Sequence, residues 1–171
     1  LAVTDFGVPI DVLWLRISRQ ESDRSYPFGR VTAGHLFVML DRGSYWQVAV
    51  VIENGAFAAK QQAGLAAFRA ELRDALPFLG VRVAEIQSWD QVKLLTVTVD
   101  RLKQWSKPGF LAIGDAAHAM SPVGGVGINL AIQDAVATAN ILAPILQRRV
   151  PRFGELKRIQ RRRAFPTWIV Q

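Results

Sequence analysis

Residues 114–135 read GDAAHAMSPVGGVGINLAIQDA, and this stretch decides how the chain is interpreted. It follows a short, wholly apolar run at 110–113 (FLAI), which is typical of a buried strand covered on both faces. Apolar side chains then recur at helical spacing and form one stripe: Ile128, Ile132, Ala135, Ala139, Leu142 and Leu146. We therefore expect a buried strand, a turn-rich loop over 114–127, and a helix that begins near Gly127.

The loop between strand and helix has the chemistry of a ligand site. Asp115 directly follows the strand, at the end where open α/β sheets bind ligands, and its carboxylate can accept hydrogen bonds from two hydroxyls of a sugar-like chain. Gly124, Gly125 and Gly127 allow a positive φ or a close approach to a flat ligand. A helix N-terminus near Gly127 suits a phosphate or an oxygen that gains negative charge. The alternative is that Asp115 simply caps the following turn.

Several common site patterns do not fit. Residues 125–130 (GVGINL) lack the third small residue of a dinucleotide fingerprint, and no strand immediately precedes them. No Lys-Ser/Thr pair follows, so the loop is not a phosphate loop of the Walker type. We find no serine or carboxylate arrangement for hydrolysis and no metal-ligand spacing, and the pattern alone identifies no catalytic residue.

The pattern GD-A-A-H-x-x-x-P-x-x-G-x-G-x-N-x-A-I-x-D-A strongly resembles the second flavin motif of the para-hydroxybenzoate hydroxylase family of FAD-dependent monooxygenases. The flanks at 99–109 and 158–167 are similar to the same family. The motif positions that match are Gly114, Asp115, His118, Pro122, Gly125, Gly127, Asn129 and Asp134. The resemblance implies FAD as cofactor and NAD(P)H as reductant.

The resemblance also implies roles for residues of the loop. Asp115 would bind the ribityl hydroxyls of FAD, and residues 122–129 would line the isoalloxazine ring, with Pro122 near its reactive side. The N–H groups of Ile128 and Asn129 would face the pyrimidine oxygen, where a helix N-terminus stabilises the negative charge of reduced flavin. The cofactor-binding residues expected are Gly114, Asp115, Pro122, Gly124, Gly125, Val126, Gly127, Ile128 and Asn129.

Other notable side chains have structural interpretations. We expect His118 to pack or hydrogen-bond within the turn rather than to act as a general base. Asp134 is expected to anchor a neighbouring loop rather than to touch the flavin. Trp46, Trp89 and Trp105 are expected in the core rather than in an aromatic pocket.

The rest of the chain predicts a mixed α/β fold. Strands are expected at 11–18, 34–40, 45–52 and 91–99, with a hairpin turn at 41–44, and helices at 61–76, stopped by Pro77, and 155–165, ended by Pro166. Residues 1–100 are interpreted as a substrate-facing region with a mostly antiparallel sheet. Residues 101–171 are interpreted as the C-terminal part of an FAD-binding region, a strand–loop–helix segment.

Two features of the family have no counterpart in the sequence. The family begins with a G-x-G-x-x-G turn in a Rossmann unit and has a central Asp-Gly motif, and neither occurs in these 171 residues. Residues 1–12 resemble the family's sequence just downstream of the Asp-Gly motif. We therefore expect a truncated chain whose missing N-terminal FAD-binding unit is its natural partner.

The function implied is that of an FAD-dependent monooxygenase which, when intact, uses NAD(P)H and O2 to hydroxylate a small organic, aromatic substrate. The fragment alone is expected to be inactive. The alternative is a non-catalytic remnant that binds no FAD and self-associates through apolar surface. A homo-oligomer is expected in either case.

Charge and composition argue against a nucleic-acid-binding protein and against a membrane-spanning protein. Residues 148–163 hold eight of the 21 basic residues and one of the 14 acidic residues, so the rest of the chain balances and the net charge of +7 belongs to this segment. No stacking platform or recognition motif accompanies it, so we expect a solvated or domain-contacting helix face rather than nucleic-acid binding. The apolar segment 127–146 contains Asn129, Gln133, Asp134 and Asn140, which argues against a membrane span. The absence of cysteine favours a cytoplasmic protein.

Overall fold

The computed structural model describes residues 1–32, 34–122 and 124–171. The chain forms two compact units. The sheet unit is Pro9–Thr96, and the helix unit combines Leu1–Val8 with Val97–Gln171.

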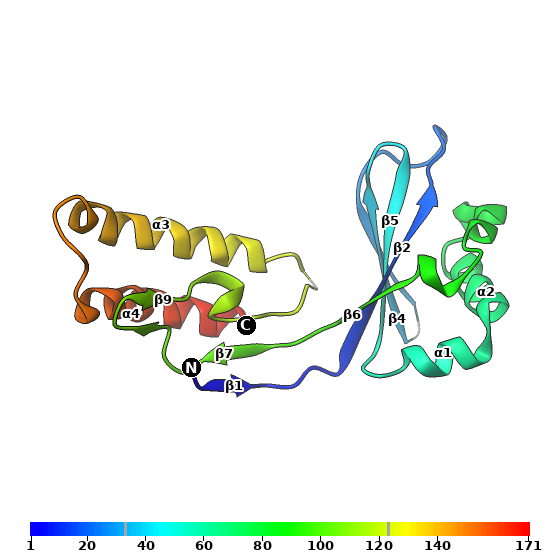
Figure 1. The fold of residues 1–171 in the computed structure, drawn as a ribbon. Helices are drawn as coiled ribbons and strands as arrows, with labels where there is room; N and C mark the ends of the chain where they lie inside the picture. Colours follow the sequence, from blue (N-terminus) through cyan, green and yellow to red (C-terminus); the bar gives the residue numbers. More distant parts are fainter. Residues whose placement is uncertain (33, 123) are drawn as a thin grey trace. The chain divides into compact units, whose positions relative to one another are not determined.

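The sheet unit is built on a five-stranded antiparallel sheet with the strand order β3-β4-β5-β2-β6 (Figure 1). Its strands are β2 (Ile10–Ser18), β3 (Phe28–Thr32), β4 (His35–Asp41), β5 (Tyr45–Glu53) and β6 (Lys93–Thr96). The strands predicted at 11–18, 34–40 and 45–52 are confirmed. The predicted hairpin is confirmed as well, because Asp41 pairs with Trp46 across the turn.

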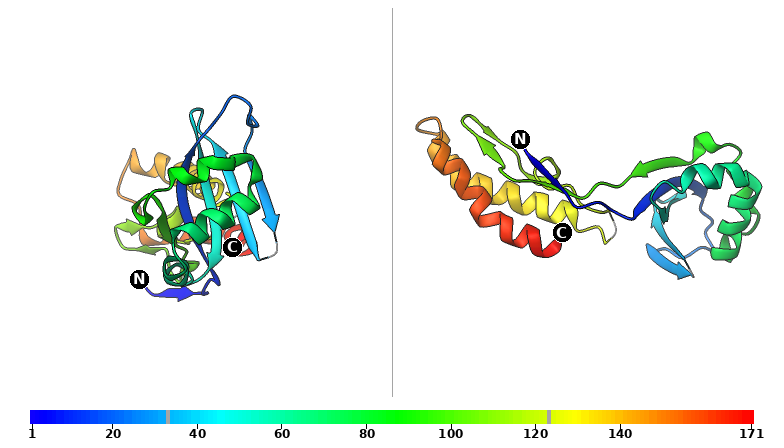
Figure 2. Two further views of the ribbon diagram at one scale, coloured as in Figure 1. Left: turned by 90° about the vertical axis from the view of Figure 1, so that its right-hand side faces the viewer. Right: turned by 90° about the horizontal axis from the view of Figure 1, so that it is seen from below.

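Helices cover one face of this sheet (Figures 1 and 2). They are α1 (Phe57–Ala63), α2 (Leu65–Ala75) and the 3-10 helices η1 (Pro77–Glu85) and η2 (Trp89–Gln91). Because side chains alternate along a strand, Leu13, Leu15 and Ile17 of β2 all point into the core beneath the helices. The single helix predicted at 61–76 is wrong in one respect: Gly64, with φ +93°, divides it into two helices.

The long strand predicted at 91–99 is also wrong, since β6 covers only Lys93–Thr96. Its partner β2 begins at Ile10, and the last pair of the ladder joins Asp11 to Thr96. Beyond that point the backbone finds another partner, because the carbonyl of Val99 accepts a hydrogen bond from the N–H of Phe6 at 2.9 Å.

The helix unit consists of two short strand pairs and two long helices. Its elements are β1 (Val3–Asp5), β7 (Asp100–Leu102), β8 (Ser106–Lys107), β9 (Phe110–Leu111), the 3-10 turn η3 (Gly114–Ala116), α3 (Gly127–Leu146) and α4 (Phe153–Val170). β1 pairs with β7, and β8 with β9, both antiparallel. The helices α3 and α4 lie side by side (Figure 2). The fold is thus mixed α/β with antiparallel sheets, as predicted.

The prediction of a buried strand at 110–113, covered on both faces, is wrong about the strand's length and burial. β9 has two residues and pairs with β8 in a two-stranded sheet, and Phe110 is 52% exposed. A pair of short strands leaves much of its surface open, so an apolar run was not sufficient evidence for a strand covered on both faces.

α4 is longer than predicted, because it continues through Pro166 to Val170. Proline removes one helical N–H but does not prevent the helix when packing holds the flanking turns. Thr167 is fully buried, and its hydroxyl donates to the carbonyl of Arg163 at 2.9 Å across this turn.

α3 has the predicted bounds, but its packed face differs from the predicted apolar stripe. Ile128, Ile132 and Leu146 are 68%, 54% and 59% exposed. The buried positions are Leu130, Asp134, Ala137 and Leu142. Among the described residues α3 is the one helix long and apolar enough to cross a membrane, yet the middle of its buried face carries a carboxylate that is paired within the helix unit.

Candidate cofactor site

The segment that resembles a flavin motif lies between β9 and α3. It begins with the 3-10 turn at Gly114–Ala116, continues without regular structure, and enters α3 at Gly127. The predicted order of strand, loop and helix is therefore confirmed for the described residues; Val123, within the range 122–129, lies outside them.

Gly114 occupies a position that only glycine fits well. Its φ is +59°, and a Cβ built on it would lie 3.0 Å from the Cβ of Ala131. The turn therefore rests directly on α3, and a side chain at this position would both strain the backbone and push the turn away from the helix.

Asp134 connects the turn to both helices. Its fully buried carboxylate accepts hydrogen bonds from the N–H of Gly114 at 3.1 Å, from Nε2 of His118 at 2.6 Å and from Nε of Arg163 at 2.7 Å. An ionised carboxylate only accepts, so Nε2 of His118 carries the proton in this arrangement. The prediction that Asp134 anchors a neighbouring loop is confirmed.

The surroundings of Asp134 favour its ionised form. Burial raises the pKa of the carboxyl, but hydrogen bonds from His118, Arg163 and the Gly114 amide outweigh burial, so the pKa lies below its usual value. A paired, ionised carboxylate at this position stabilises the turn and the contact between α3 and α4.

His118 has a structural environment, as predicted. Its side chain is 1% exposed, and its ring lies 5.0 Å, between centroids, from the ring of Trp105, which is fully buried. With one ring nitrogen bonded to Asp134 and the ring packed on an indole, His118 fixes the turn rather than meeting solvent or substrate.

Asp115, in contrast, is exposed, although it follows the tightly held Gly114 directly. Its side chain does not cap the 3-10 turn. Among the residues that the structure describes, its carboxylate has neither a hydrogen bond nor an ion pair. The alternative of a turn cap is thus not found in this part of the chain, and the carboxylate is available to accept hydrogen bonds from a ligand.

Gly124 and Gly125 leave a short part of the loop before α3 without side chains. Gly124 and Gly125 have φ values of +89° and +65°, and no atom lies within 4 Å of a Cβ built on either. The N–H of Gly125 donates to the carbonyl of Pro122 at 3.1 Å, which closes the turn. Gly127 is tighter, because a Cβ there would lie 3.2 Å from Cγ of Met120.

The first turn of α3 leaves at least one amide available. The carbonyl of Val126 accepts the N–H of Asn129 at 3.1 Å and that of Leu130 at 3.3 Å. Within the described residues the N–H of Ile128 has no acceptor, as expected at a helix start. Of the two amides predicted to face a ligand, that of Ile128 is unbonded in the part of the chain that the structure describes, and that of Asn129 is already used in the helix.

Arg163 is the member of the buried hydrogen-bond network around Asp134 that was not predicted from the sequence. It stands in a run of three arginines, within the segment interpreted as a solvated or domain-contacting helix face, and its side chain is only 9% exposed. Its second nitrogen Nη2 also donates to Oε1 of Gln133 at 2.8 Å. Helical phase was the available signal, since Ile159, Arg163 and Thr167 are four residues apart and all are buried.

The comparisons with known proteins agree with this geometry. The model of a family described as an FAD binding domain matches residues 3–166. The chain belongs to this FAD-binding family, and the predicted resemblance to the para-hydroxybenzoate hydroxylase type of flavoprotein is confirmed.

Curated relatives include several monooxygenases. The chain is 32% identical over 140 residues to 6-methylpretetramide 4-monooxygenase of Streptomyces rimosus, a match that covers 81% of this chain and 33% of that protein. It is 40% identical over 77 residues to a kynurenine 3-monooxygenase of Stenotrophomonas maltophilia (strain K279a), which covers 45% of this chain and 16% of the relative. The chain thus spans a third or less of the length of these relatives.

Solved structures share the fold. PqsL, a probable FAD-dependent monooxygenase from Pseudomonas aeruginosa, superimposes with a TM-score of 0.77 at 19% identity, over 99% of this chain and 48% of that one. The tetrameric form of 2-methyl-3-hydroxypyridine-5-carboxylic acid oxygenase gives a TM-score of 0.69 at 15% identity, over 97% and 45% of the two chains. The myxobacterial halogenase CndH gives 0.70 at 17% identity, over 90% and 37%.

Proposed function

We propose that this chain carries the part of an FAD-dependent monooxygenase that binds the flavin end of FAD, and that the complete flavoenzyme uses NAD(P)H and O2 to hydroxylate a small organic, aromatic substrate. The observation that supports this most is the position of Asp115. Its carboxylate is exposed, and the backbone that carries it is held by the buried hydrogen bond from the N–H of Gly114 to Asp134 of α3.

The residues present fit a flavin. Asp115 offers acceptors for ribityl hydroxyls, and the loop at Gly124 and Gly125 allows a flat ring to approach the backbone. The N–H of Ile128, in the first turn of α3, has no acceptor within the described residues. The set that we assign to the cofactor is Gly114, Asp115, Pro122, Gly124, Gly125, Val126, Gly127, Ile128 and Asn129. Bound FAD would supply the redox chemistry between NAD(P)H and oxygen, as cofactors do.

The residues of this set would orient the cofactor and stabilise negative charge on its ring. Asp115 would hold the sugar-like chain through hydrogen bonds to its hydroxyls. The N–H of Ile128 and the dipole of α3 stabilise negative charge on the ring edge that faces them. Asp134 and His118 would not contact the cofactor; they hold in place the turn that carries Asp115.

We infer that the adenine end of FAD is held by a separate dinucleotide-binding unit, because no G-x-G-x-x-G turn occurs in residues 1–171. These residues alone are then expected to hold FAD weakly or not at all and to leave NAD(P)H unoxidised. A cytoplasmic location is part of the same proposal, with the absence of cysteine as its support.

For the substrate we propose the face of the five-stranded sheet that carries no helices. Trp14 and Val38 both pair with Ala49 in the ladders, so these three side chains form one row across β2, β5 and β4. Trp14 and Val38 are half-buried and point away from the helix-covered core. A row of an indole and aliphatic groups suits the flat, apolar body of an aromatic compound.

The test of the function is incorporation of labelled oxygen. In the complete flavoenzyme, oxidation of NAD(P)H under 18O2 should place one 18O atom in an aromatic product. NAD(P)H oxidation without label in any product would indicate a reductase and contradict the proposal. A product that appears only with added halide would favour the halogenase chemistry of a structural neighbour instead.

A second candidate, a self-associating protein without catalysis, is favoured by the outer face of α3. Ile128, Ile132 and Val136 are 68%, 54% and 54% exposed and lie on consecutive turns. Such a row stabilises a complex when another apolar surface covers it. We propose that copies of this chain associate through this row when nothing else covers it.

A further inference from the structure

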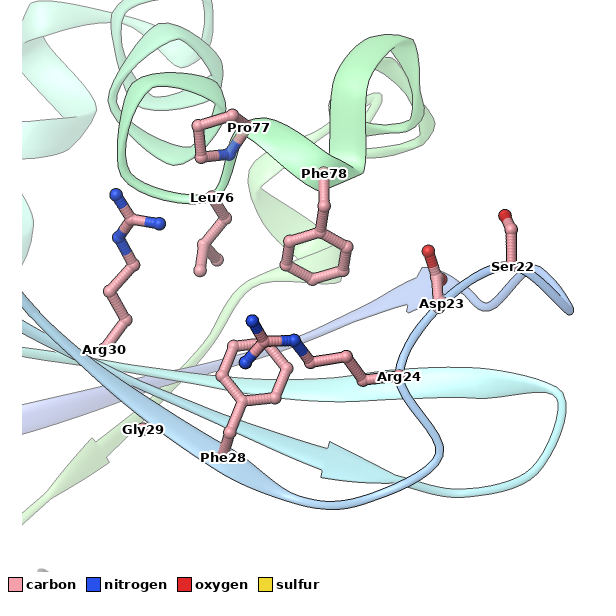
Figure 3. Close-up of a pocket in the computed structure, with 9 residues that line it drawn as sticks. All are labelled: Ser22, Asp23, Arg24, Phe28, Gly29, Arg30, Leu76, Pro77 and Phe78. Atoms are coloured by element: carbon pink, nitrogen blue, oxygen red, sulfur yellow. The ribbon is translucent and has the colours of Figure 1, made fainter.

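A pocket of about 530 Å³ lies within the sheet unit, on the helix-covered side of the sheet. It is therefore separate from the open face that we propose for the substrate. Its walls come from the edge strand β3, the segment that precedes β3, and the start of η1 (Figure 3). Its volume is in the range of pockets that hold small organic ligands.

The apolar part of this pocket is a pair of aromatic rings. The rings of Phe28 and Phe78 lie 5.7 Å apart between centroids, and both contact the indole of Trp46, at 5.7 Å and 6.1 Å. Trp46 is fully buried, so it holds both rings in place, whereas Phe78 itself is 39% exposed. Leu76 and Pro77 extend this surface. A flat apolar body can pack on such a pre-formed floor without a large ordering cost.

Two arginines supply the charge of the pocket. Arg24 reaches across the ring of Phe28, and Arg30 extends from β3 toward Leu76 and Pro77 (Figure 3). The guanidinium carbon of Arg24 lies 5.3 Å from the centroid of the Phe28 ring. Within the described residues neither arginine pairs with a carboxylate.

The acidic residue in the pocket wall does not neutralise these charges, because it is already paired. Asp23 accepts hydrogen bonds from Nη1 and Nη2 of Arg82 at 2.5 Å and 2.8 Å, and from Nε1 of Trp46 at 2.9 Å. The bonds from Arg82 hold the pKa of Asp23 well below its usual range. The pocket therefore presents two unpaired cations above an aromatic floor.

We propose that this pocket is a binding site for a small aromatic carboxylate, whose ring packs on Phe28 and Phe78 and whose carboxylate is shared by Arg24 and Arg30. Guanidinium groups match the fork geometry of a carboxylate and also stack on aromatic faces. A neutral aromatic compound would leave the two arginines unpaired, and a bare anion would leave the floor uncovered. The site stands on these contacts alone and does not depend on the flavin assignment.

The test is calorimetric titration of the 171-residue protein with 2-naphthoate. Two comparison ligands separate the contributions: 2-naphthamide has the ring without the charge, and inorganic phosphate has charge without the ring. We expect saturable 1:1 binding of 2-naphthoate and at least tenfold weaker binding of both comparison ligands. The exposed side chains permit Arg24→Gln and Arg30→Gln without loss of fold, and each variant should weaken 2-naphthoate binding about tenfold or more, because each removes a charge-assisted hydrogen bond.

Arg42→Gln is the matched control, since Arg42 is exposed in the turn between β4 and β5, outside the pocket. It should bind 2-naphthoate as the unchanged protein does. Unaltered affinity in both pocket variants would place the ligand elsewhere and overturn the proposal. Equal losses in Arg42→Gln and the pocket variants would reduce the effect to net charge, and an absence of saturable binding would contradict the site outright.

Discussion

The backbone N–H of Gly114 donates to the carboxylate of Asp134 at 3.1 Å, and this bond joins the first residue of the candidate flavin loop to the middle of α3. Asp115, the proposed ligand of the ribityl chain, is the next residue. Its position therefore depends on a buried carboxylate that lies nineteen residues later in the chain and that would not itself touch the cofactor.

Replacing that carboxylate should cost much of the stability of the helix unit. Asp134→Asn leaves Arg163 buried without its counter-ion, and breaking a buried pair in this way destabilises by roughly 3–5 kcal/mol. Urea unfolding would measure the loss. Asp74→Asn is the matched control, because the Asp74 side chain is 77% exposed, and it should have little effect. Equal stability of Asp134→Asn and the unchanged protein would show that the buried network contributes nothing net.

The same carboxylate predicts a pH dependence. Burial raises the pKa of Asp134, but the hydrogen bonds from His118, Arg163 and Gly114 lower it below the ordinary value, about 3.9, that it has in the unfolded chain. As the pH falls, the unfolded state takes up the proton first, so the stabilisation is complete above that value and is lost as the pH drops toward the folded pKa. Urea unfolding at pH 6 and pH 3 should show a larger loss for the unchanged protein than for Asp134→Asn. Identical pH profiles would contradict this.

Gly114→Ala tests the close approach of the turn to α3. The φ of +59° and the 3.0 Å distance to the Cβ of Ala131 both oppose a side chain, so we expect a loss of roughly 1–3 kcal/mol in unfolding free energy. Gly154→Ala is the control, because no atom lies within 4 Å of a Cβ built on this residue of α4. That change should be neutral or slightly stabilising. An equally large loss of unfolding free energy in Gly154→Ala would show that the close approach of Gly114 to α3 is not the cause of the loss in Gly114→Ala.

The exposed row on α3 predicts association. Ile132→Glu places a charge in the row and should shift the 171-residue protein from oligomer to monomer in light scattering at high concentration. Gln133→Glu is less suitable as a control, since Gln133 bonds to Arg163. Gln62→Glu, exposed on α1 and therefore outside the row, should leave the oligomer intact. A monomeric unchanged protein would end the proposal of self-association.

The local pattern predicted the elements better than their surroundings. The bounds of α3 followed from helical spacing, and the loop at 114–127 followed from its glycines. The packed face of α3 could not be read, because the helix is apolar on two sides and its buried side contains Asp134. That residue is tolerated there only because Arg163 and His118, from distant parts of the chain, neutralise and bond it. Long-range pairing of this kind leaves no periodic signal.

The same limit explains the shortened strands. The runs at 91–99 and 110–113 are rich in residues that favour strands, but a strand extends only as far as its partner. β6 ends where β2 begins, and β9 has only β8 beside it. Two helix ends were also mispredicted. Gly64 divides a helix that spacing predicted as continuous, and Pro166 lies inside a helix that it was predicted to end.

The affinity of the complete flavoenzyme for flavin in the Asp115→Ala variant tests the central claim most directly. The carboxylate should accept charge-assisted hydrogen bonds from the ribityl chain, so its loss should weaken FAD binding by about tenfold to a hundredfold. Binding of lumiflavin, which lacks the ribityl chain, should not change, and His118→Ala should lower thermal stability with less effect on the activity of protein that retains FAD. Titration of the apoprotein with FAD and with lumiflavin gives both affinities. Unchanged FAD affinity in Asp115→Ala, with only thermal stability reduced, would contradict the assignment of Asp115 to the cofactor.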